Sequence, residues 1–133
     1  MTKPAILFLC IHNAGRSQMA AAFARSIGGD ALTVYSAGTQ PGETLHPVVV
    51  EVMAEVGLDI TDQKPMSLTE EMARASRVVV TMGCGDECPY YPGVKYLDWP
   101  LDDPKGQPLE KVRAIRDDIR DRVAALVDSV LTE

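Results

Sequence analysis

A cysteine, an arginine and a serine stand close together near the start of this 133-residue chain, in the segment Cys10-Ile-His-Asn-Ala-Gly-Arg16-Ser17. The cysteine ends an apolar run, and the serine opens a stretch with helical periodicity. The segment is therefore predicted to be a turn between a strand and a helix. A turn of this length can aim several backbone N–H groups at one point, to which the helix N-terminus adds its positive end. We expect a tetrahedral oxyanion to bind there.

The residue types of this segment suit such a site. The Arg16 guanidinium can grip two oxygens of the anion. The same positive field favours the thiolate of Cys10, which would make it a nucleophile at neutral pH. Ser17 can hold the thiolate by a hydrogen bond, and Asn13 tolerates the left-handed backbone of a tight loop. The predicted oxyanion-binding residues are Ile11, His12, Asn13, Ala14, Gly15 and Arg16. A buried strand cysteine followed by a solvated arginine is the alternative, which the order of elements disfavours.

The rest of the chain alternates between strand and helix patterns. Strands are predicted over residues 5–10, 32–36, 77–82 and 94–97, and helices over residues 17–25, 47–56, 68–74 and 108–131. Ser67 and Glu70 are predicted to form a capping box at the start of the third helix. The alternation predicts a parallel sheet covered by helices on both faces. Functional groups in such folds gather at the carboxyl ends of the strands, where Cys10 and Cys84 both fall.

Charge and composition exclude several classes of function. Thirteen Lys and Arg against nineteen Asp and Glu give a net charge of −6, so a nucleic-acid partner is not expected. Apolar runs stay far short of the ~20 residues of a membrane span, and the N-terminus lacks the pattern of a secretory signal. We expect a single cytoplasmic domain over residues 1–133, without a membrane partner. Charges at residues 113–122 are interpreted as a solvated helix face with i,i+4 pairs.

Residues 10–17 resemble the phosphate-binding loop of low-molecular-weight protein tyrosine phosphatases and of the arsenate reductases built on the same fold. Further similar segments lie at residues 35–38, 56–60, 78–82 and 102–104, so the resemblance covers nearly the whole chain. It implies a three-layer α/β/α fold with a central four-stranded parallel sheet. It also implies that Asp103, before Pro104, lies over the loop as a general acid. Asp102 is the alternative for that role, and an ordinary turn is the interpretation without the resemblance.

Three features are closer to the reductases than to the phosphatases. Gln18 follows the loop, where the phosphatases typically have proline. Lys105 and Gly106 follow the Asp-Pro turn, where the phosphatases usually carry tyrosines. The segment Cys84-Gly-Asp-Glu-Cys88 comes just after the third predicted strand and resembles the redox segment of thioredoxin-coupled arsenate reductases.

This last resemblance implies a relay of three cysteines. Cys10 attacks arsenate, Cys84 attacks Cys10 and releases arsenite, and Cys88 moves the disulfide to the Cys84–Cys88 pair. Thioredoxin or another cytosolic thiol donor then reduces that pair. The implied role is arsenic detoxification by a monomer that needs no cofactor. A zinc site is disfavoured because it needs four ligands, and only His12, His46 and scattered carboxylates would remain.

Two other functions stay open at this point, as does the electron donor. The chain could be a phosphatase acting on phosphotyrosine or small phosphoesters, or a non-catalytic sensor of a phosphate-like oxyanion. Relatives that use a small thiol such as mycothiol typically lack the second cysteine pair. The presence of that pair here favours thioredoxin.

Overall fold

The computed structural model describes residues 3–83 and 88–132, so the predicted relay residue Cys84 lies outside the described residues. A four-stranded parallel sheet forms the centre, with β1 (Ala5–Cys10), β2 (Thr33–Gly38), β3 (Val78–Thr81) and β4 (Tyr96–Asp98) in the order β2-β1-β3-β4. Cys10 pairs with Gly38 and Leu9 pairs with Thr81. The carboxyl ends of β1, β2 and β3 therefore meet at one edge of the sheet.

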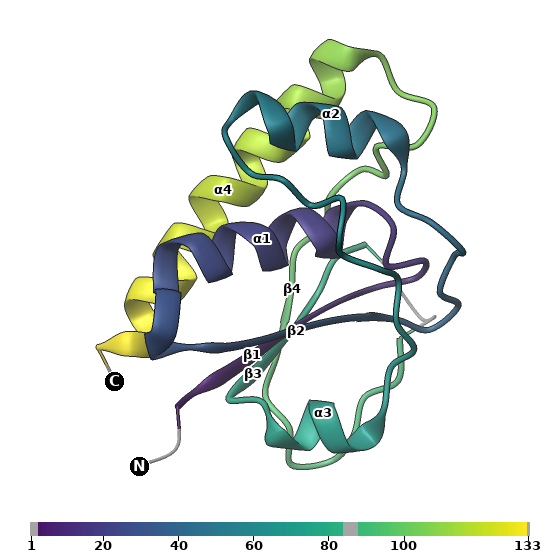
Figure 1. Ribbon diagram of the computed structural model, residues 1–133. Coiled ribbons are helices and arrows are strands. Elements are labelled where there is room, and N and C mark those ends of the chain that lie inside the picture. The colour runs from purple at the N-terminus through teal and green to yellow at the C-terminus, as the bar shows by residue number, and fades with distance from the viewer. Residues whose placement is uncertain (1–2, 84–87, 133) are drawn as a thin grey trace.

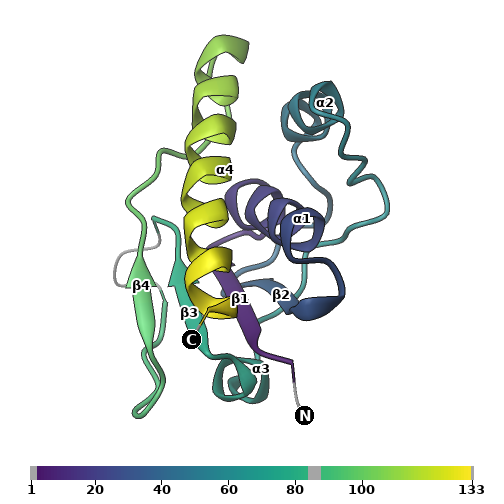
Figure 2. The same ribbon diagram turned by 90° about the vertical axis from the view of Figure 1, so that its left-hand side faces the viewer.

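Helices cover both faces of this sheet. On one face lie α1 (Arg16–Gly28), α2 (Pro47–Glu55) and α4 (Leu109–Leu131), and on the other lies the short α3 (Glu70–Ala75), as Figures 1 and 2 show. A single 3-10 turn, η1 (Gly29–Ala31), follows α1. The predicted three-layer α/β/α fold with a four-stranded parallel sheet is confirmed. Among the described helices, none combines the length and apolar character that a membrane span requires.

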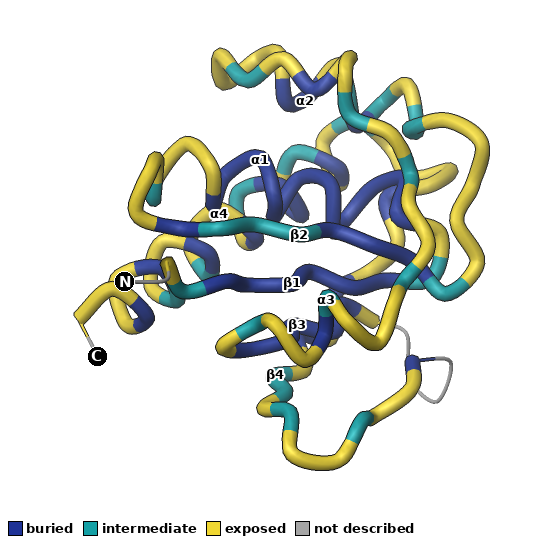
Figure 3. Tube along the Cα trace, turned by 60° about the horizontal axis from the view of Figure 1, so that its bottom comes forward, coloured by how far each residue is buried: buried dark blue, intermediate teal, exposed yellow. Residues whose placement is uncertain are grey.

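The side chains of β1 alternate between two hydrophobic clusters. Ile6, Phe8 and Cys10 pack on the face that α1, α2 and α4 cover. Leu7 and Leu9 pack on the α3 face, as expected from the two-residue period of a strand. Figure 3 shows β1 buried along its whole length, with β2 and β3 on either side. This burial makes β1 a rigid base for the loop that follows it.

The predicted cap of α3 is wrong. The residue that caps this helix is Thr69, whose side-chain oxygen accepts a hydrogen bond from the Met72 amide at 3.2 Å. Ser67 instead forms a β-bridge to Gly38, because amides and carbonyls of residues 66–68 bond to the end of β2. This pairing keeps the chain extended until residue 69.

Candidate active site

The loop between β1 and α1 turns its backbone N–H groups inward. All six carbonyl oxygens of residues 10–15 accept hydrogen bonds: four from backbone amides of the segment 39–46, and two from the Gln18 side chain and the Met19 amide of α1. Across a planar peptide, the carbonyl of one residue and the N–H of the next point in opposite directions. The N–H groups of residues 11–16 are thus directed to the side away from these partners. Converging amides of this kind form a site for an anion.

Asn13 braces the loop from inside. It is fully buried, and among the described residues it is the one non-glycine with a positive φ, 50°. Its Oδ1 accepts a hydrogen bond from the Met66 amide at 2.9 Å, so its Nδ2 is left to donate to Ser17 Oγ at 2.6 Å. The Ser17 proton is then free to point at Cys10 Sγ, 2.9 Å away. A hydrogen bond donated to sulfur stabilises a thiolate.

Cys10 lies at the carboxyl end of β1, buried and with a free thiol. Arg16 begins α1, and 7% of it is exposed. Its Nη1 donates to the carbonyl of Leu101 at 3.0 Å, which fixes the plane of the guanidinium beside the loop. Gly83, at the end of β3, lies directly against Arg16, because a Cβ at Gly83 would collide with Nη1. The arginine is therefore held by two segments that are distant in sequence.

The two neighbouring aspartates of the late turn face different partners. An Asp103 carboxylate oxygen lies 4.0 Å from Arg16 Nη2. The carboxylate of Asp102 pairs instead with Lys111 of α4 at 2.9 Å, and the hydrogen bond from that lysine lowers the pKa of Asp102. The structure thus brings Asp103, and not Asp102, to the loop.

A small pocket opens above Cys10. The residues that line it are Cys10, His12, Ala14, Gly15, Arg16, His46 and Asp103. Sequence reasoning did not assign the side chain of His46 to the site. This residue caps α2 and is half-buried against Gly15, since a Cβ on that glycine would lie 3.2 Å from the imidazole. Burial lowers the pKa of His46, although the charge of Asp103 opposes the effect.

The sequence alone did not predict where His46 and Cys88 lie relative to the Cys10 loop. His46 contacts Gly15 only because the segment 39–46 wraps around the loop. Cys88 is buried and packs with Leu7 and Leu9 on the α3 face of the sheet, opposite the face to which Cys10 belongs.

Within residues 3–83 and 88–132, no three His, Cys, Asp or Glu side chains gather as a metal site would require.

Comparison with known proteins gives a consistent set of matches. Residues 5–133 match the model of the family described as low molecular weight phosphotyrosine protein phosphatase. The chain is 42% identical to a putative arsenate reductase of Halobacterium salinarum over 91% of this chain and 89% of that protein. It is 39% identical to an arsenate reductase of Staphylococcus aureus over 90% of this chain and 93% of that protein.

A solved structure is also similar. A thioredoxin-dependent arsenate reductase of Corynebacterium glutamicum is 43% identical, with a TM-score of 0.84 over 98% of this chain. The present chain spans only 64% of the length of that one.

Proposed function

This chain belongs to the low molecular weight phosphotyrosine protein phosphatase family, and we propose that it is an arsenate reductase that converts arsenate to arsenite in arsenic detoxification. The observation that carries the proposal is the free thiol of Cys10 at the base of an inward-facing amide loop, next to Arg16 and Asp103. The similarity to reductases of two organisms supports the choice of arsenate over a phosphoester.

The first step is attack of the Cys10 thiolate on the arsenic atom of arsenate. An S–As bond forms and the bond from arsenic to a hydroxyl group of the protonated arsenate breaks, and this hydroxyl takes a proton from Asp103 and leaves as water. The charge on the remaining oxygens is balanced by the loop amides and the Arg16 guanidinium. The hydroxyl of Ser17, 2.9 Å from the sulfur, stabilises the thiolate before attack and again when it is regenerated.

The second step is reduction by a relay of thiols. The Cys84 thiolate attacks Cys10, the S–As bond breaks with its electron pair staying on arsenic, and arsenite leaves. Cys88 then attacks Cys84, which frees Cys10 and leaves a Cys84–Cys88 disulfide. The packing of Cys10 and Cys88 on opposite faces of the sheet supports a role for a middle thiol.

The electrons come from an external dithiol, and we propose thioredoxin as this partner. The thioredoxin-dependent reductase of Corynebacterium glutamicum, at 43% identity, supports this choice. A dithiol protein can reduce the Cys84–Cys88 disulfide by the same exchange chemistry, which balances the two electrons delivered to arsenic.

The proposal is tested by arsenate-dependent NADPH oxidation in the presence of thioredoxin and thioredoxin reductase. Turnover is expected in the wild type and should be lost in Cys10→Ser, Cys84→Ser and Cys88→Ser. Hydrolysis of p-nitrophenyl phosphate, measured in parallel, should require Cys10 but neither Cys84 nor Cys88. A fast phosphatase that survives Cys84→Ser, with no arsenate turnover with any thiol donor, would contradict the reductase proposal.

A further inference from the structure

We propose that Gln63 and Arg25 are positioning residues for the nucleophile, acting through a chain of hydrogen bonds whose direction is fixed at every link once Cys10 is a thiolate. The inference rests on the proposed function only in taking Cys10 as the reacting group. This chain of hydrogen bonds runs along α1 from the surface to the thiol, through Arg25, Gln63, Gln18, Asn13, Ser17 and Cys10.

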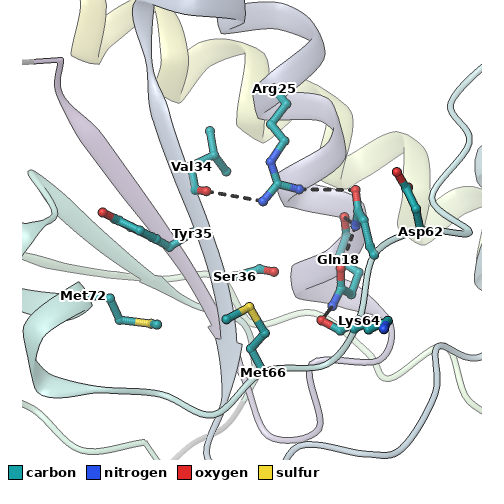
Figure 4. Close-up of a pocket in the computed structure, with 10 residues that line it drawn as sticks. Gln18, Arg25, Val34, Tyr35, Ser36, Asp62, Lys64, Met66 and Met72 are labelled. Atoms are coloured by element: carbon teal, nitrogen blue, oxygen red, sulfur yellow. Dashed lines mark hydrogen bonds between the residues drawn. The ribbon is translucent and has the colours of Figure 1, made fainter.

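The outer end of the chain sets the orientation of Gln63. Arg25 Nη2 donates to the carbonyl of Val34 at 3.3 Å (Figure 4), while its Nη1 donates to Gln63 Oε1 at 3.2 Å. A guanidinium has donors only, so Gln63 must present its oxygen to Arg25. Its amide nitrogen then donates to Gln18 Oε1 at 2.6 Å.

The inner end sets the orientation of Gln18 independently. Gln18 is 1% exposed, and its Nε2 lies 2.9 Å from the Asn13 carbonyl and 3.1 Å from the Lys64 carbonyl. Carbonyl oxygens can only accept, so the nitrogen must face them and the oxygen must face Gln63. The two ends of the chain therefore demand the same orientation at the contact between the glutamines.

The chain continues to the sulfur with the same constraint. Gln18 Nε2 also donates to Asn13 Oδ1 at 3.1 Å, alongside the Met66 amide. The Asn13 nitrogen is thereby directed to Ser17. The Ser17 hydroxyl lies 2.9 Å from Cys10 Sγ and must donate to it when the sulfur is a thiolate, which can only accept. Loss of the donor at Gln63 would leave Gln18 Oε1 without this partner and loosen the amide that orients Asn13. We expect the thiolate of Cys10 to lose part of its stabilisation as a result.

The position of Gln63 allows a clean substitution. It is half-buried and lines a cavity of about 370 Å³ beside α1 and β2, together with Arg25 and Gln18. A methionine, similar in length but without hydrogen-bonding groups, fits this space without crowding the core. Gln63→Met therefore removes the hydrogen bonds of this side chain to Arg25 and to Gln18, including a long one of 3.4 Å to the Gln18 carbonyl.

The experiment measures the rate of Cys10 alkylation by iodoacetamide as a function of pH, in the full reduced chain, with the Cys10 peptide resolved by mass spectrometry. We expect Gln63→Met to move the pH midpoint of alkylation upward and to slow the reaction at pH 7 by roughly threefold. Arg25→Met, at the exposed outer end, should shift the midpoint in the same direction by less. An unchanged midpoint in both variants would overturn the proposal.

Two controls separate this effect from a general structural one. Thr61 lies on the same segment, but its hydroxyl bonds to Asp59 at 2.6 Å, so Thr61→Val should leave the midpoint unchanged. In a Ser17→Ala background, Gln63→Met should cause no further shift, because the link to the sulfur is already cut. A full shift in that background would overturn the route through Ser17. Alkylation does not involve arsenate, so the outcome is independent of whether the chain reduces it.

Discussion

At the scale of single residues, the neighbouring aspartates Asp102 and Asp103 differ in what they can do. Both are exposed acids in the same turn, and both are the right type for a general acid. Only Asp103 approaches the loop, at 4.0 Å from Arg16, while Asp102 is held by Lys111. A proton donor must reach the departing oxygen, so position and not residue type separates the two.

This difference predicts unequal effects of the same substitution. Asp103→Asn should lower kcat for arsenate reduction by about 100-fold or more, because an amide cannot protonate the leaving oxygen. Asp102→Asn should leave kcat near the wild-type value, since it only removes an exposed ion pair with Lys111. Steady-state kinetics of both variants give the comparison. Equal losses in the two variants would show that Asp103 is not the acid.

At the scale of elements, two arginines of α4 form ion pairs with Glu55, the last residue of α2, and we call this group of contacts the clamp. Arg113 and Arg116 both bond to the Glu55 carboxylate, at 2.7 Å and 2.8 Å, and Arg116 also donates to the Val52 carbonyl. These bonds, above all the one from Arg113, lower the pKa of Glu55 to about 2. The clamp matters for the site because His46 lies at the other end of α2.

The clamp predicts a specific dependence of stability on pH. The pKa of Glu55 is depressed from 4.5 to about 2, so its contribution is complete above pH 4.5 and lost as pH falls towards 2. The difference in Tm between wild type and Arg113→Met should thus be largest above pH 4.5 and shrink towards pH 2. In a Glu55→Gln background the same substitution should give a difference that varies much less over this range, because only the weaker attraction of Arg113 to Glu51 and Glu110 remains. Thermal unfolding followed by circular dichroism measures both.

The elements themselves were largely predictable from the sequence, because hydrophobic periodicity is a local property. The long helix was predicted over residues 108–131 and observed over Leu109–Leu131. The predictions that were wrong concern residues whose partners lie in distant parts of the fold. Ser67 has the right type for a helix cap, but its segment pairs with the end of β2. Arg113 was interpreted as part of a solvated face with i,i+4 pairs, yet it reaches across to Glu55, although Arg122 does pair with Asp118 in that way.

At the scale of the whole molecule, the site is assembled where three segments meet. The loop after β1 carries Cys10 and Arg16, the end of β3 carries Gly83, and the turn after β4 carries Leu101 and Asp103. The strand order β2-β1-β3-β4 places β1 and β3 side by side. The turn between β1 and α1 could be predicted because it is contiguous in sequence. The support of Arg16 could not be predicted, because it comes from Gly83 and Leu101, which lie 67 and 85 positions after Arg16 in the sequence.

Gly83 therefore offers a test of this assembly. A side chain there would press on Arg16 Nη1 and lie 2.8 Å from the Leu101 carbonyl that the same nitrogen binds. Gly83→Ala should displace the guanidinium and raise KM for arsenate by about tenfold or more, because charged hydrogen bonds to the anion are lost. Alkylation of Cys10 should change much less, since Asn13 and Ser17 still orient the thiol.

Gly93 provides the matched control for this substitution. Its φ of +84° is close to the +82° of Gly83, but a Cβ there would meet nothing within 4 Å. Both alanine variants incur the backbone strain of a positive φ, about 1–2 kcal/mol, and Gly83→Ala should lose more thermal stability than Gly93→Ala because its Cβ also collides with Arg16 and the Leu101 carbonyl. Only Gly83→Ala should also lose affinity for arsenate. If Gly93→Ala raised KM equally, the effect would come from strain spreading through the fold, and the contact between the end of β3 and Arg16 would have no separate part in binding the anion.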